Sequence, residues 1–236
     1  MKGEGDMRSN NLTIGFLLFI ALLFGGCASY SPSVVRMDKF GPDTVKHTEG
    51  DLCIYMEEYA SEEKCETAFD ADLYDEGVLP LLIMVENNGQ QPYEVKVMDI
   101  VVRDEDNVLK ALTPEEAASK AKRSAVGRAI GWSLIVPIVA IPVAAAASAR
   151  DTSKVNKQII NDFTAKSFQE GIIMPNKEIT GFLFIEIDKE REDLSDLRLE
   201  MTASNVDTGE LTTISIPLPN EKLRKENKER DPITGS

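Results

Sequence analysis

The chain has 236 residues, 42% of them apolar, which is enough for one substantial domain or two small ones with a packed core. Its formal net charge is −14, from 26 Lys and Arg against 40 Asp and Glu. This balance argues against nucleic acid as a partner, because phosphate binding requires clustered basic side chains. It also disfavours attachment to an anionic membrane through charge alone.

Residues 1–26 are predicted to be an export signal. Residues 12–26 (LTIGFLLFIALLFGG) carry no charge, and Met7-Arg8 just upstream offers an alternative start with a short positive region. The apolar stretch is shorter than a typical membrane span and fits the central region of a signal peptide. The alternative interpretation is an uncleaved signal anchor with an incidental cysteine.

The apolar stretch ends in Leu23-Phe24-Gly25-Gly26-Cys27, which resembles the lipobox of bacterial lipoproteins, with Phe24 where Leu is usual. The resemblance implies cleavage before Cys27, a thioether from its thiol to diacylglycerol, and an acylated amino terminus. Each buried methylene of a lipid chain contributes about 0.8 kcal/mol, so several chains hold a protein firmly to a membrane. The family often has Asp after the cysteine for retention in the inner membrane. Ala28 therefore favours the outer membrane of the cell envelope, facing the periplasm.

Lipidation of Cys27 leaves Cys53 and Cys65 as an even pair. An oxidising compartment permits a disulfide between them, and closing so short a loop would contribute about 3 kcal/mol. Two unbonded thiols are the alternative. No metal or cofactor is expected, since His47 is the only histidine and no CxxC motif is present.

Residues 27–50 are predicted to be a lipidated tether, because they are rich in Ser, Pro and Gly and show little periodicity. Residues 51–112 and 176–220 are predicted to form one antiparallel β-sandwich of six or seven short strands. Turns are expected at 87–89, at 104–107 and around Asn205, Asp207 and Gly209, and a bulge near 100–102. The expected strands cover 52–56, 79–85, 93–103, 108–109, 179–187, 197–203 and 211–218.

This mature part resembles envelope lipoproteins with an immunoglobulin-like β-sandwich. The resemblance is one of architecture, because the sequence lacks the Cys-Trp-Cys spacing of a true immunoglobulin domain. The charged tail at 221–236 is expected to fray.

Residues 113–175 are predicted to be a helical insertion in the sandwich. Thr113-Pro114-Glu115-Glu116 is a helix-start signature: a capping hydroxyl, a proline in the first turn, then acids near the positive end of the helix dipole. Residues 129–149 contain no charge and are long enough to span a bilayer. Residues 151–169 have apolar side chains near helical spacing and predict an amphipathic helix that closes at Gly171.

A single membrane crossing at 129–149 would place the two halves of the sandwich on opposite sides. Pro137 and Pro142 favour a break, which predicts a helical hairpin instead. Trp132 is expected to mark an interface or the edge of the hairpin. Small residues that allow close helix contact are Gly127, Gly131, Ala140, Ala144 and Ser148. Three placements stay open: burial on its own sandwich, partial entry into a membrane, or a self-association surface.

Motifs for catalysis are missing from the sequence. His47 stands alone in the predicted tether, and no GxSxG, HExxH or phosphate-binding glycine loop occurs. The favoured function is therefore a non-enzymatic envelope lipoprotein whose apolar hairpin contacts the membrane, further copies or another envelope protein. The alternative is a carrier that binds a lipid or another apolar ligand between hairpin and sandwich. A hydrolase that uses paired carboxylates is the third possibility.

Overall fold

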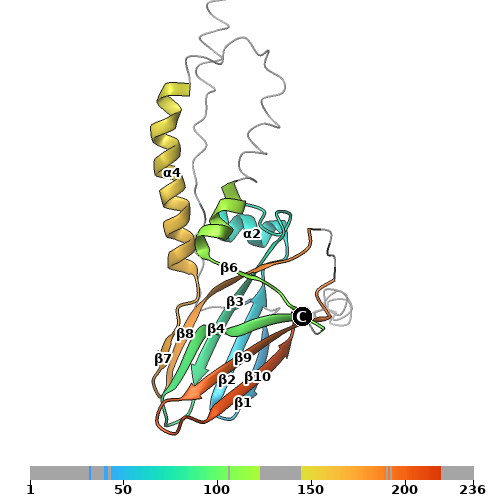
Figure 1. Ribbon diagram of the computed structural model, residues 1–236, viewed down its shortest axis with the longest axis vertical. Coiled ribbons are helices and arrows are strands. Elements are labelled where there is room, and N and C mark those ends of the chain that lie inside the picture. Colours follow the sequence, from blue (N-terminus) through green and yellow to red (C-terminus); the bar gives the residue numbers. More distant parts are fainter. Residues whose placement is uncertain are drawn as a thin grey trace, which may run out of the picture.

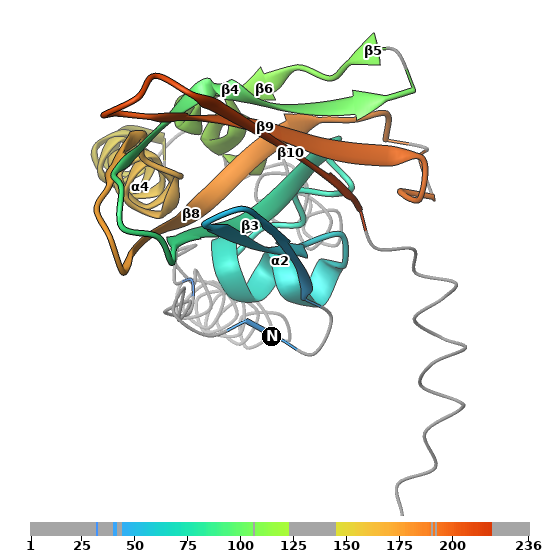
Figure 2. The same ribbon diagram turned by 90° about the horizontal axis from the view of Figure 1, so that it is seen from below.

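The computed structural model describes residues 32, 40–41, 44–105, 107–122, 145–189, 191 and 193–218. Two antiparallel sheets lie face to face, with helices on the outer side of one of them (Figures 1 and 2). Sheet A has the order β1-β2-β3-β8-β6, and sheet B has the order β10-β9-β4-β5 with β7 also paired to β4. This confirms a mainly antiparallel β fold with helices. The strand order does not identify the immunoglobulin topology, which stays a prediction.

Sheet A consists of β1 (Val45–Glu49), β2 (Leu52–Glu58), β3 (Val78–Asn87), β8 (Lys177–Glu186) and β6 (Ala111–Leu112). Sheet B consists of β10 (Leu211–Pro217), β9 (Leu197–Asn205), β4 (Tyr93–Asp104), β5 (Asn107–Val108) and β7 (Gly171–Ile173). The helices are α2 (Glu62–Phe69), a helix at 114–122 and α4 (Ala145–Lys166).

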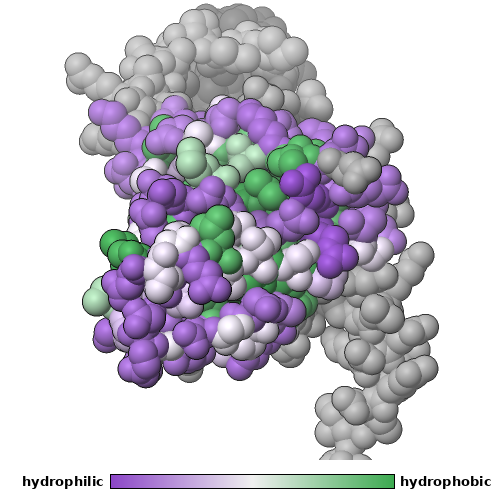
Figure 3. Space-filling view, turned by 60° about the horizontal axis from the view of Figure 1, so that its bottom comes forward, coloured by the Kyte–Doolittle hydropathy of each residue, from purple (hydrophilic) through white to green (hydrophobic). Residues whose placement is uncertain are grey.

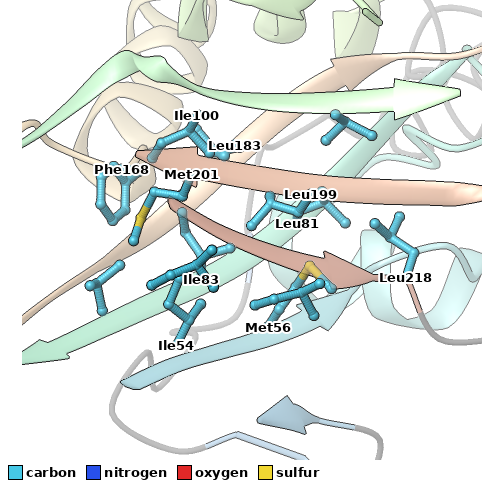
Figure 4. Close-up of a cluster of buried hydrophobic side chains, with 14 of the residues drawn as sticks. Ile54, Met56, Leu81, Ile83, Ile100, Phe168, Leu183, Leu199, Met201 and Leu218 are labelled. Carbon is cyan, nitrogen blue, oxygen red and sulfur yellow. The ribbon is translucent and has the colours of Figure 1, made fainter. Parts of the chain in front are cut away.

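The main core lies between the two sheets (Figure 4). Alternate residues of each strand point into it, since successive side chains of a strand face opposite sides of the sheet. Leu81 and Ile83 of β3 lie across from Leu199 and Met201 of β9, and all four are fully buried. Burial of this kind contributes about 1.5–3 kcal/mol for each large apolar side chain.

The pairing of β3 with β8 joins the parts of the chain that precede and follow the insertion. It runs without interruption from Val78↔Glu186 to Asn87↔Lys177. In sheet B the register of β4 against β9 shifts between Val95 and Ile100, so the predicted irregularity in this strand is present a few residues earlier than expected. Met98 lies in the irregular stretch and is 78% exposed.

Three elements correct the sequence-based boundaries. β1 lies within the predicted tether and pairs with β2. β7 lies within the predicted helical insertion and pairs with β4. α2 follows β2 where no helix was expected. β1 and β7 have only 5 and 3 residues, too few for a periodic pattern, and β1 contains a single Val among polar residues.

The sandwich has two different ends. We call the "helical end" the one where β2 ends and β3 begins, which carries α2, the helix at 114–122 and the N-terminal part of α4 (Figure 1). We call the "distal end" the opposite one, formed by the loops at 50–51, 88–92, 174–176 and 206–210.

Candidate functional site: the seat of the helical insertion

The outer face of sheet A carries a second hydrophobic core. β-strand residues Leu82, Phe182 and Phe184 point away from the main core and contact the helices. Phe69 of α2 meets Phe182 edge-on at 5.0 Å between ring centroids, and Phe163 of α4 stacks on Phe184 at 5.3 Å. Such pairs add about 0.5–1.5 kcal/mol each beyond burial. The two described ends of the insertion, the helix at 114–122 and α4, both pack on this aromatic cluster. We call them the first and the second stem.

The first stem is the helix at 114–122, and its start confirms the predicted capping signature. The backbone N–H of Glu116 donates to Thr113 Oγ1 (3.2 Å), and the N–H of Thr113 donates to Glu116 Oε2 (2.8 Å). This reciprocal capping box satisfies two N–H groups that the helix would leave unpaired. The hydrogen bond from the Thr113 backbone and the Lys110 ammonium both hold the pKa of Glu116 below its usual range.

Small side chains let the first stem lie close to its neighbours. Ala117, Ala118 and Ala121 are buried in the second core. Lys120 extends from the same helix to Glu186 Oε1 (2.8 Å) on β8, and this contact lowers the pKa of the Glu186 carboxyl. The stem is thus fixed by apolar packing on one side and by an ion pair at its margin.

The second stem is the C-terminal part of α4. Ile159 and Phe163, four residues apart on one face of the helix, are buried in the second core. Lys166 is also buried, and its ammonium donates to Asp162 Oδ2 (2.7 Å) and to the carbonyl oxygen of Ala68 (2.6 Å). It lies 5.5 Å from the centroid of the Phe69 ring. Lys166 therefore joins the end of α4 to the end of α2.

Directly after α4 the backbone runs against β8. The N–H of Phe168 donates to the carbonyl oxygen of Phe182 (2.9 Å), and Ser167 forms a parallel bridge with Phe182. Gly181 makes this approach possible, because an added Cβ would lie 2.4 Å from the Cα of Phe168. The direction in which α4 leaves the sandwich is set by this contact and by Lys166.

The N-terminal part of α4 extends past α2 and away from the sheets (Figure 1). At about 1.5 Å per residue, Ala145 lies on the order of 20 Å beyond Ile159 along the helix axis. Among the described residues, no helix is both long and apolar enough to cross a membrane.

Two residues that precede β1, Phe40 and Gly41, also pack on this side of sheet A. The N–H of Gly41 donates to Glu57 Oε2 (2.9 Å), and the Phe40 ring lies 5.9 Å from that of Tyr55. Phe40 also packs against the second core. Gly41 fits because a Cβ there would lie 2.9 Å from Glu57 Oε1. No sequence pattern pointed to this contact.

Glu57 is held in place from its other side by α2. Its Oε1 lies 2.8 Å from the Lys64 ammonium, which also donates to the carbonyl oxygen of Glu58 (3.0 Å). Burial, together with the nearby carboxylate of Glu57, raises the pKa of Tyr59 to about 12. The tyrosine therefore stays neutral at any physiological pH. The contacts of Glu57 with Gly41 and with Lys64 hold the segment before β1 and α2 on the same face of sheet A.

The predicted disulfide is wrong in this structure, where Cys53 and Cys65 are both free and buried. Cys65 Sγ donates to the carbonyl oxygen of Tyr59 (3.0 Å), whereas Cys53 Sγ accepts from Thr48 Oγ1 (3.4 Å). Tyr59 lies six residues beyond Cys53 along an extended chain, on the order of 20 Å. A disulfide requires Cα atoms within about 7 Å. Two cysteines close in sequence are thus kept apart by the straightness of β2.

Several predicted site residues lie outside the described part of the chain. They are Cys27 for lipidation, and Gly127, Gly131, Trp132, Pro137, Ala140, Pro142 and Ala144 of the apolar segment. These remain predictions from the sequence.

Two acidic side chains at the helical end, Asp104 and Asp196, share an ion pair with Arg191. The Arg191 guanidinium lies 2.7 Å from Asp104 Oδ2 and 2.6 Å from Asp196 Oδ2, and it holds the pKa of Asp104 below its usual range. This fork ties the β8–β9 loop to the end of β4. Within the described ranges, no three His, Cys, Asp or Glu side chains are grouped as metal ligands would be.

Comparison with known proteins gives little further information. No family model matches the chain, and no curated protein is significantly similar in sequence. A crystal structure of a candidate lipoprotein (ycdA) from Bacillus subtilis superposes at a TM-score of 0.33, with 15% identity over 85% of this chain. The superposed region spans 37% of the length of that structure. A likeness this weak carries no argument about fold or function.

Proposed function

We propose that this protein is a non-enzymatic lipoprotein of the cell envelope. Its β-sandwich serves as a scaffold that holds an apolar helical insertion toward the membrane or toward further copies of the chain. Lipid on Cys27 provides the anchor, and the outer membrane, facing the periplasm, is its expected location.

The observation that carries this proposal is the way the two stems are held. Ala117 and Ala118 of the first stem, and Ile159 and Phe163 of the second, are buried in one core on sheet A. The chain between the stems includes most of the uncharged run at 129–149. So long an apolar segment is costly to leave in water and marks an interaction site. Because both stems are fixed to sheet A, they support a role in which the sandwich presents the apolar segment to a membrane or to another protein, rather than one in which the insertion is a loose linker.

Membrane fractionation of the full chain tests the proposal. The variants are Cys27→Ser, a deletion of residues 125–149, and both together, with deletion of the tail 221–236 as the matched control. We expect detergent to be needed to release the wild type and the tail deletion. Each single variant should be released in part by high salt or alkaline carbonate, and the double variant should be fully soluble with the circular dichroism spectrum of a folded β protein.

Two results would contradict it. Release of the wild type without detergent would argue against the lipid anchor. A deletion of 125–149 that leaves membrane association and assembly unchanged but abolishes uptake of a fluorescent fatty acid would instead favour the carrier function.

A further inference from the structure

The chain that leads back to Cys27 and the stems of the insertion meet in one place. Phe40 packs against the second core, the same cluster that buries Ala118, Ile159 and Phe163. Glu57 fixes Gly41 beside it through the 2.9 Å hydrogen bond. The route to the lipid anchor and the helical insertion therefore start from the same face of the sandwich.

The strand register shows at which end of this face the chain departs. β1 begins with Val45 opposite Met56, two residues before β2 ends at Glu58. Glu58 leads through Tyr59 and Ala60 to Ser61, the N-cap of α2. The segment before β1 thus enters the sandwich at the helical end. At about 3.3 Å per residue, the ten residues of β3 place the distal end on the order of 30 Å away.

The distal end exposes both apolar side chains and acids. Figure 3 brings it forward and shows apolar areas with hydrophilic side chains between them, and Met174, Val206 and Leu211 are exposed in or beside its loops. Glu49, Asp51, Asp207 and Glu210 are exposed in or beside its loops. Acids are exposed at the helical end as well, among them Glu62, Glu63 and Asp75, so surface charge does not decide which end faces an anionic bilayer. The place where the chain enters the sandwich does.

We propose that the helical end faces the bilayer that holds the lipid on Cys27, so that the sandwich stands end-on with its distal end directed away from the membrane. This orientation rests on the proposed function, because it requires the anchor. The exposed acids Glu62 and Glu63 of α2 do not oppose it. The N-terminal part of α4 projects past α2 (Figure 1), so α2 and these acids are not the part of the helical end that reaches furthest from the sandwich.

Fluorescence quenching on vesicles tests the orientation. The full lipidated chain is reconstituted into vesicles of phosphatidylethanolamine and phosphatidylglycerol that contain a lipid with a fluorescent energy acceptor on its headgroup, because energy transfer quenches the label over a longer range than contact does and Lys157 lies twelve residues from the start of α4. A bimane label is placed on Lys157→Cys in α4, on Gln90→Cys in the distal loop, or on Thr213→Cys on the outer face of sheet B, all exposed positions. The buried thiols of Cys53 and Cys65 should not take the label.

We expect the label at 157 to be quenched several-fold more strongly than the labels at 90 and 213. Equal quenching at all three positions, or stronger quenching at 90 or 213, would overturn the orientation. Co-flotation with the vesicles is measured in the same samples. Protein that does not float contradicts the proposed function itself, whereas floating protein with the wrong quenching order contradicts only the end-on arrangement.

Discussion

The ammonium of Lys166, near the end of α4, donates to the carbonyl oxygen of Ala68 near the end of α2, at 2.6 Å. The last carbonyls of a helix lack partners within it and lie at the negative end of its dipole, so a buried cation is favourable there. The contact joins two helices that are about a hundred residues apart in sequence. It thereby helps to fix the orientation of α4 relative to α2.

Replacing Lys166 by Met tests this relationship. The variant keeps the length of the side chain but leaves the Ala68 carbonyl without its donor, so we expect the free energy of unfolding to fall by about 1–3 kcal/mol. Hydrogen exchange should speed up in α4 more than in β3. Lys157→Met, at an exposed position of the same helix, is the control and should change neither quantity. Equal behaviour of the two variants would show that Lys166 does not hold α4.

A glycine substitution tests the close approach of the backbone to β8. Gly181→Ala places a Cβ against the backbone of Phe168, which cannot move without displacing α4, so we expect a loss of about 1–3 kcal/mol in chemical denaturation. Gly171→Ala is the matched control, since nothing lies within 4 Å of its added Cβ. A stable Gly181→Ala variant would mean that the segment after α4 packs elsewhere.

Acid should weaken the fold through carboxylates whose pKa is lowered in the folded state. The Glu116 pKa lies below 4.5 because the Thr113 N–H and the Lys110 ammonium stabilise its charged form. Its contribution is present above the unfolded pKa and is lost as pH falls through the lower, folded pKa. We expect the Tm to fall as the pH drops through and below the ordinary carboxyl value of 4.5, and to fall less steeply in Glu116→Gln than in the wild type. Identical slopes would exclude Glu116 as a contributor.

The two buried thiols should be reduced but slow to react. Burial raises the pKa of Cys65 to about 12, so very little thiolate is present at neutral pH. In Cys27→Ser, which leaves only these two cysteines, we expect almost no alkylation of the folded protein at pH 8. Both thiols should be alkylated after unfolding without a reducing agent, as mass spectrometry would show. A mass 2 Da lower and resistance to alkylation would instead demonstrate a disulfide.

The longer strands could be predicted because they alternate or are continuously apolar. Leu197–Asn205 alternates buried and half-exposed side chains along most of its length, and Val78–Asn87 is buried along nearly its whole length. Each pattern persists over enough residues to exceed chance. The start of the helix at Thr113 was also predictable, since capping depends on side chains three residues apart.

α2 could not be recognised in the same way. Its sequence EEKCETAF has a weak apolar face, and Cys65, Ala68 and Phe69 become its buried side only because sheet A and α4 supply a surface. The contacts of Lys166 with Ala68 and of Glu57 with Gly41 were missed for the same reason. They join residues that are distant in sequence and belong to no short motif.

The hydrogen bond between Gly41 and Glu57 also limits how far the domain can travel. With Phe40 and Gly41 fixed to sheet A, Cys27 lies thirteen residues before Phe40 in the sequence. Fully stretched, that length is on the order of 45 Å. A lipidated copy would therefore sample only a thin layer above its membrane, and would meet surface-bound partners at a far higher effective concentration than one released into solution.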